Sequence, residues 1–166
     1  MNRTGKRLVA AVVALVVAGA LVLLFSQKPA APQAAFTTLK GEQIALDSLR
    51  GKVVLVNFWA TSCPGCIKEM PELVNVHQKY HSRGLETIAV AMSYDPPEYV
   101  QLFTEKNGLP LTVALDAGGA AAQSFGDVRL TPTTFVIDRQ GKIIQRYVGE
   151  PDFGQLHALI EGALQK

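Results

Sequence analysis

The chain contains two cysteines, Cys63 and Cys66, separated only by Pro64 and Gly65. Cysteine thiolates are the nucleophiles of thiol–disulfide exchange, and two intervening residues let one helical turn bring the sulfur atoms within bonding distance. A structural disulfide across so short a loop would add little stability, because it constrains little of the unfolded chain. A Cys-x-x-Cys pair between a strand and a helix is typical of a redox site. We therefore predict that this pair is oxidised and reduced reversibly.

The segments around the pair predict where each thiol lies. The apolar run Val53–Phe58 predicts a buried strand, and the residues from Ile67 onward predict a helix. Cys63 would then lie at the N-terminus of the helix, where Thr61 or Ser62 could cap it. The partial positive charge and free N–H groups of a helix N-terminus stabilise a thiolate and lower its pKa. Cys63 is thus the predicted nucleophile, and Cys66, inside the first turn, the predicted resolving thiol.

The rest of the pattern predicts an α/β domain over residues 36–166. Residues Phe36–Leu46 predict a small hairpin before the core strand. Apolar runs bounded by turn residues predict the remaining strands at Leu85–Met92, Leu111–Leu115, Thr133–Asp138 and Lys142–Val148. Amphipathic segments predict helices between these strands and a final helix after Asp152. The order predicts a mixed central sheet with helices on both faces and an N-terminal β-hairpin extension.

Residues 1–25 predict a membrane anchor. Three cations among the first seven residues precede an unbroken apolar stretch, Leu8–Phe25, which would span about 27 Å as a helix. The cations before the span predict a cytoplasmic N-terminus, so the domain would face the periplasm in a Gram-negative cell. Ala18-Gly19-Ala20 has the small-x-small pattern of a signal-peptidase site, so cleavage stays an alternative. The apolar stretch is, however, longer than usual for a cleaved signal. Residues 26–35, rich in Pro and Ala, predict an unpacked tether.

Charge and histidine content set limits on the partners. A formal net charge of +2 with 18% charged residues shows no basic stripe, so no nucleic-acid partner is predicted. His77 and His81 lie one helical turn apart, a spacing that can bind a metal, but no third ligand accompanies them. We predict no metal site and interpret both histidines as polar residues on a solvated helix face.

Two separated motifs resemble a known family. The segment Phe58–Cys66 resembles the active-site signature of the thioredoxin superfamily. Glu69-Met70-Pro71 and Leu130–Asp138 make the chain most similar to the TlpA/ResA-like membrane-anchored thiol–disulfide oxidoreductases. The resemblance extends over Phe36–Lys166 and implies a thioredoxin-like fold.

The resemblance implies a client-binding surface opposite the cysteines. Pro132 takes the place of the cis-proline that faces the pair, and the backbone of Thr131 is expected to pair with a bound client segment. Trp59 is implied to lie beside the active site and to form part of the same binding surface.

The resemblance also implies how the proton of Cys66 is handled. Glu69 lies three residues further along the same helix face, where the family is expected to use a glutamate to manage protons for the buried cysteine. Burial would raise the pKa of such a carboxyl toward that of the thiol. Asn57 stands where thioredoxins carry a buried acid, which leaves the proton-handling role to Glu69.

The implied activity is reduction of disulfides in extracytoplasmic client proteins without a cofactor. Electrons would come from a membrane thiol carrier, and clients would include apocytochrome c or a cytochrome oxidase assembly factor. Many members carry a proline directly before the second cysteine, whereas this chain has Pro64-Gly65 between the cysteines. The direction of electron transfer is therefore not fixed, and the oxidising direction stays open. Binding of Cu(I) by the two thiols, as in an assembly chaperone, stays open as well.

Overall fold

The computed structural model describes residues 13, 15–17, 19 and 28–165. The predicted membrane anchor and the start of the predicted tether fall mostly on residues outside this part. None of the described helices is both long and apolar enough to cross a membrane. The elements are β1 (Ala35–Thr38), β2 (Gln43–Ala45), η1 (Leu46–Leu49), β3 (Val53–Trp59), α2 (Pro64–Tyr80), η2 (His81–Arg83), β4 (Leu85–Ala91), α3 (Pro97–Asn107), β5 (Thr112–Leu115), α4 (Ala120–Ser124), β6 (Thr133–Ile137), β7 (Ile143–Val148) and α5 (Phe153–Leu164).

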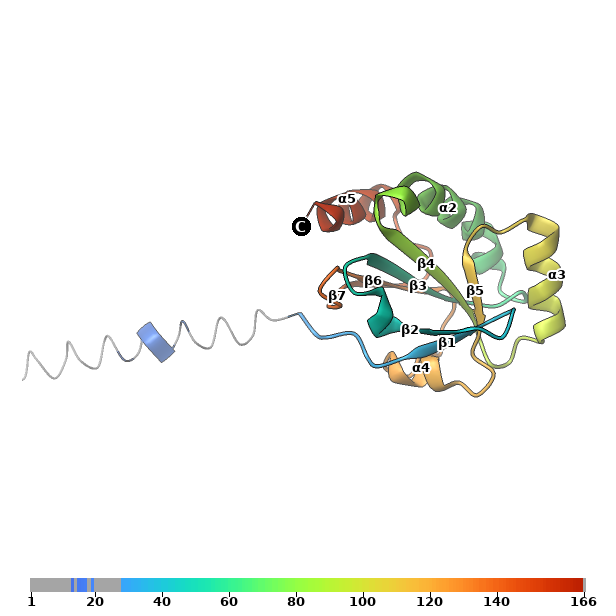
Figure 1. Cartoon of the computed structure of the whole chain (residues 1–166), viewed down its shortest axis with the longest axis horizontal. Coiled ribbons are helices and arrows are strands. Elements are labelled where there is room, and N and C mark those ends of the chain that lie inside the picture. Colours follow the sequence, from blue (N-terminus) through green and yellow to red (C-terminus); the bar gives the residue numbers. More distant parts are fainter. Residues whose placement is uncertain (1–12, 14, 18, 20–27, 166) are drawn as a thin grey trace, which may run out of the picture.

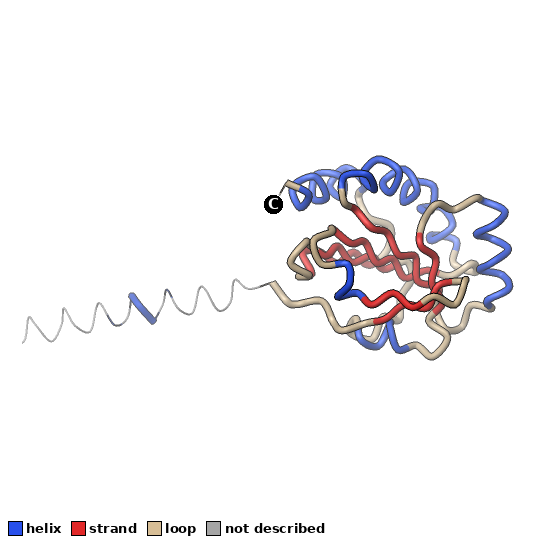
Figure 2. Tube along the Cα trace, in the orientation of Figure 1, coloured by secondary structure: helices blue, strands red, loops and turns tan. Residues whose placement is uncertain are grey.

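Seven strands form one mixed sheet in the order β2-β1-β5-β4-β3-β6-β7. The central strands β3, β4 and β5 are parallel, whereas β6, β7 and the β1–β2 hairpin pair antiparallel at the two sides. Helices α2, α3 and α5 lie on one side of the sheet and the short α4 on the other (Figures 1 and 2). This arrangement confirms the predicted mixed sheet, its two helical layers and the N-terminal hairpin.

Strand β3 is buried over its whole length, as expected for a central strand covered on both faces. Alternate side chains enter opposite layers of the core. Val54, Val56 and Phe58 pack with Phe125 and Phe135 on the α4 side. Val53, Leu55 and Trp59 point to the α2 side and belong to clusters that include Leu73 and Leu156. The strand thus carries the chain from the middle of the core to the active-site edge of the sheet.

The tether prediction is wrong for the residues that the structure describes. Pro29 lacks an N–H, but its carbonyl oxygen accepts a 2.9 Å hydrogen bond from the backbone of Ile143. Ala31 donates to the carbonyl oxygen of Gly141 at 2.9 Å, and Ala31 and Ala34 pack against the core. The side chains here are small and apolar, so this segment fits onto the surface despite its two prolines.

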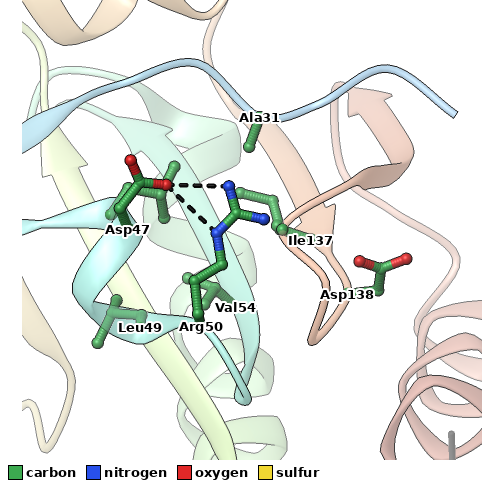
Figure 3. Close-up of a pocket in the computed structure, with 9 residues that line it drawn as sticks. Ala31, Asp47, Leu49, Arg50, Val54, Ile137 and Asp138 are labelled. Atoms are coloured by element: carbon green, nitrogen blue, oxygen red, sulfur yellow. Dashed lines mark hydrogen bonds and ion pairs between the residues drawn. The ribbon is translucent and has the colours of Figure 1, made fainter.

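Where this segment crosses the domain, it closes a cavity of about 10 Å³ beside η1 and the β6–β7 turn (Figure 3). Arg50 donates to Asp47 Oδ1 from Nε at 3.3 Å and from Nη2 at 3.0 Å, and its Nη1 donates to the carbonyl of Gln140. Gly141 has a φ of +71°, and a Cβ there would collide with the Arg50 guanidinium. The cavity is therefore a structural junction between these segments, and neither cysteine lines it.

The histidine prediction needs a correction. His77 on α2 is buried, and its ring packs on that of His81 with centroids 4.6 Å apart. Burial, together with the neighbouring His81, lowers the pKa of His77. The helix turns His77 toward the core, next to Val76 and Tyr80, and only His81 is exposed. Within the described residues, no group of three or more His, Cys, Asp or Glu side chains could hold a metal ion.

Candidate active site

Cys63 and Cys66 form a disulfide at the start of α2, with their Cα atoms 5.3 Å apart. Cys66 is fully buried among Trp59, Met70 and Leu73, whereas Cys63 is partly exposed. A client can therefore reach only one of the two sulfur atoms. This asymmetry is what an attacking thiol and an internal resolving thiol require.

The helix cap differs from the prediction. Cys63 itself occupies the N-cap position, and its Sγ accepts a hydrogen bond of 3.2 Å from the backbone N–H of Cys66. Pro64 takes the first helical position, where no N–H is needed. The helix terminus thus directs a backbone donor at the exposed sulfur, which is the contact that stabilises a thiolate.

Thr61, one of the two predicted caps, is held elsewhere. Its backbone N–H and its hydroxyl each donate a 2.6 Å hydrogen bond to the carboxylate of Asp95, which is buried. Asp95 follows β4, so it ties the loop before Cys63 to the neighbouring parallel strand. The prediction missed Asp95, although a polar residue at the carboxyl end of a parallel strand is the available signal.

The loop before β6 lies against the cysteine turn. The Thr131–Pro132 peptide bond is cis, as predicted. A Cβ added at Gly65 would lie 3.5 Å from Pro132 Cδ, so the two segments are nearly in contact. Pro132 is buried, and its carbonyl oxygen accepts a 2.8 Å hydrogen bond from the backbone of Gly149. Thr131 remains partly exposed beside the pair.

Three exposed apolar side chains come from segments next to this loop. Tyr94 is 58% exposed, and its hydroxyl lies 3.3 Å from Thr131 Oγ1. Leu130 is 66% exposed and Val148, which pairs with Thr133 across β6 and β7, is 56% exposed. Sequence reasoning missed all three. Tyr94 and Leu130 are isolated apolar residues in loops and carry no periodic signal, and Val148 is only the last residue of a predicted strand.

Glu69 is fully buried and joins a polar network below the cysteines. Its Oε1 accepts a 2.8 Å hydrogen bond from Asn57 Nδ2, which also donates to Thr134 Oγ1 at 2.9 Å. Desolvation raises the pKa of Glu69 to about 7, although the hydrogen bond from Asn57 opposes this and the charge of Glu150 adds to it. The carboxyl can therefore gain or lose a proton near neutral pH.

Trp59 is the predicted site residue that the structure places differently. Its side chain has no exposed surface and packs on Phe103 with ring centroids 5.3 Å apart. In this structure it therefore offers no surface to a client. Because Cys66 belongs to the same cluster, Trp59 supports Cys66 from the core.

A thioredoxin-like sheet that presents a helix-capping Cys-x-x-Cys pair opposite a cis-proline defines a thiol–disulfide oxidoreductase. The Redoxin family profile matches residues 26–160. The thiol-disulfide oxidoreductase ResA of Bacillus thuringiensis (strain Al Hakam) is 38% identical over 136 residues, which cover 82% of this chain and 75% of that protein. The chain belongs to the Redoxin family and is a thiol–disulfide oxidoreductase of the ResA type.

Two solved structures extend the comparison. A thioredoxin-like protein from Neisseria meningitidis has a TM-score of 0.77 and 39% identity, covering 84% of this chain and 93% of its own. A thiol:disulfide interchange protein from Chlorobium tepidum TLS has a TM-score of 0.75 and 28% identity, covering 84% of this chain and 98% of its own. The described fold is thus shared with proteins named as a thioredoxin and as a thiol:disulfide interchange protein.

Proposed function

We propose that this protein reduces disulfides of client proteins outside the cytoplasm, with Cys63 as nucleophile, Cys66 as resolving thiol and Glu69 as proton acceptor. The observation that carries the proposal is the placement of a partly exposed sulfur at a helix N-cap and a buried sulfur one turn behind it, on the same helix as a buried carboxyl. Each group thus occupies the environment that its role demands.

The exchange proceeds in two balanced steps. The Cys63 thiolate attacks one sulfur of the client disulfide, the client S–S bond breaks, and the first client sulfur leaves as a thiolate. Glu69 takes the proton of the Cys66 thiol, and the resulting thiolate attacks Cys63 Sγ. The Cys63–Cys66 bond forms as the mixed disulfide breaks and the second client thiolate leaves. The client gains two electrons and the protein loses two.

The surface around the cysteines suits an extended client segment. Thr131 precedes Pro132, which lies close to Gly65 of the cysteine turn, and we propose that its backbone pairs with a client strand. Tyr94, Leu130 and Val148 expose apolar surface on the adjoining segments. We propose that they contact apolar side chains that flank the client cysteines, and that an unfolded client fits this surface better than a compact one.

The proposed location rests on the sequence of residues 1–25, where cations precede an apolar stretch of anchor length. A protein held at the outer side of the membrane needs its disulfide reduced again after each turnover, and a membrane thiol carrier would supply the electrons. From the family resemblance, the proposed clients carry closely spaced cysteines, as in an apocytochrome c or an oxidase assembly factor.

The trapping experiment for this function uses Cys66→Ala. Because the variant keeps Cys63 but lacks the resolving thiol, the mixed disulfide should persist. We expect a covalent one-to-one adduct with an oxidised client peptide, visible by non-reducing electrophoresis and mass spectrometry and released by dithiothreitol. Cys63→Ala is the matched control and should form none. An adduct with Cys63→Ala, or none with Cys66→Ala, would contradict the assigned order of the two thiols.

A further inference from the structure

The carboxyl group of Glu69 is one member of a chain of three buried polar side chains. Asn57 on β3 lies between the other two and donates to Glu69 at 2.8 Å and to Thr134 on β6 at 2.9 Å. All three are fully buried. Asn57 and Thr134 are also directly paired across β3 and β6, so the sheet itself fixes the distance between them.

Two oxygen atoms of these three side chains, Asn57 Oδ1 and Glu69 Oε2, are buried without a hydrogen-bond partner among the described residues. An asparagine amide carries both a donor and an acceptor, and rotation by half a turn exchanges their places. An ionised Glu69 needs a donor from Asn57, whereas a protonated Glu69 carries an O–H that needs an acceptor. The hydroxyl of Thr134 can donate or accept, so it can pair with the amide in either orientation.

We propose that Asn57 and Thr134 are positioning residues that allow Glu69 to hold and release its proton inside the core. With Glu69 ionised, the amide donates to both neighbours, as the structure shows. With Glu69 protonated, the amide rotates, and its oxygen accepts from the acid and from the Thr134 hydroxyl. The rotation itself transfers no proton and no electron. This inference rests on the proposed role of Glu69 and adds the device that lets that role operate inside the core.

The asparagine amide at position 57 suits the positioning of Glu69 in both protonation states better than an aspartate or a leucine would. An aspartate at position 57 would put a second carboxyl next to Glu69, and the two charges could not both form readily. A leucine would remove the hydrogen bond that holds the pKa of Glu69 down. The other charge that faces Glu69 is Glu150, which forms an exposed ion pair with Lys68 at 2.7 Å and stays unchanged in these variants.

Nuclear magnetic resonance of the full chain tests the proposal without an activity assay. In the wild type, the side-chain amide signals of Asn57 should shift with pH at the same midpoint as the carboxyl carbon of Glu69. In Glu69→Gln they should stay constant. Asn57→Leu should reduce the ionised fraction of Glu69 at pH 7 several-fold. If this variant does not fold, the wild-type titration alone decides.

Thr134→Val should reduce the pH-dependent shift of the Asn57 amide, because the rotated amide loses the hydroxyl that donates to it, whereas the direct hydrogen bond to Glu69 remains. Thr87→Val is the matched control, since Thr87 is equally buried on β4 and its hydroxyl has no partner. The proposal would be overturned if the amide signals of Asn57 did not shift at the titration midpoint of Glu69. It would also be overturned if Thr87→Val changed this shift as much as Thr134→Val does. A normal amide response with an unimpaired Glu69→Gln enzyme would instead contradict the proton-acceptor role and leave the positioning intact.

Discussion

Replacing Cys63 by serine is expected to reduce client disulfide reduction to the uncatalysed background. Serine cannot form the mixed disulfide, and Cys66 cannot take over because it is fully buried. The fold should survive, because a serine side chain is a good N-cap and can accept the hydrogen bond that Cys63 Sγ accepts from the backbone of Cys66. Loss of the four-residue disulfide loop also removes little stability. The measurement is insulin or peptide disulfide reduction, followed beside thermal unfolding by circular dichroism.

A comparison of Cys63→Ala with Cys63→Ser distinguishes the loss of the helix cap from the loss of the nucleophile. It should be as inactive as the serine variant but less stable by about 0.5–2 kcal/mol, because it leaves a helix N–H without its partner. Residual turnover in Cys63→Ser above the rate of a buffer control would contradict the assignment of the nucleophile.

Replacing Glu69 by glutamine is expected to slow release of the client from the mixed disulfide by about 10²-fold or more near neutral pH. The wild-type rate of this step should rise as pH increases through about 7, where Glu69 ionises and can accept the proton of Cys66. Glutamine cannot accept that proton, so this rise should disappear and the mixed disulfide should accumulate. Rapid-quench kinetics with alkylation of free thiols measures the step between pH 5.5 and 8.5.

Glu72→Gln is the matched control for this variant. Glu72 lies on the same helix but is exposed, and its substitution should leave the profile unchanged. A Glu69→Gln enzyme with the wild-type rate and pH profile would contradict the proton-acceptor role, and the raised pKa of Glu69 would then reflect burial alone.

Much of this site could be predicted because its signals are local. The apolar run of β3, the spacing of Cys63 and Cys66 and the turn between strand and helix all lie within about fifteen residues, and each follows from periodicity or from helix geometry. Pro132 lies far away in sequence, and only the family resemblance placed it opposite the pair. Its cis bond is confirmed.

The sequence-based predictions were wrong where segments that are distant in the sequence contact each other in the fold. Thr61 was expected to cap α2, but Asp95, 34 residues away, binds both its polar groups. The composition of the tether predicted an unpacked segment, yet the carbonyl of Pro29 pairs with Ile143. Burial of His77 and Trp59 likewise depends on how α2 and α3 pack on the sheet. Apart from Asp95, whose place after β4 is a signal in itself, none of these contacts has a signal within its own stretch of sequence.

The reduction potential of the Cys63–Cys66 couple tests the reductant assignment most directly. The protein is equilibrated in glutathione or dithiothreitol redox buffers, and its free thiols are alkylated and quantified by mass spectrometry. We predict a potential in the reducing range, below about −200 mV and near that of thioredoxin, so that electrons flow from Cys63 and Cys66 to the client. A value near about −120 mV, as for the oxidant DsbA, would contradict it and identify the protein as a thiol oxidase.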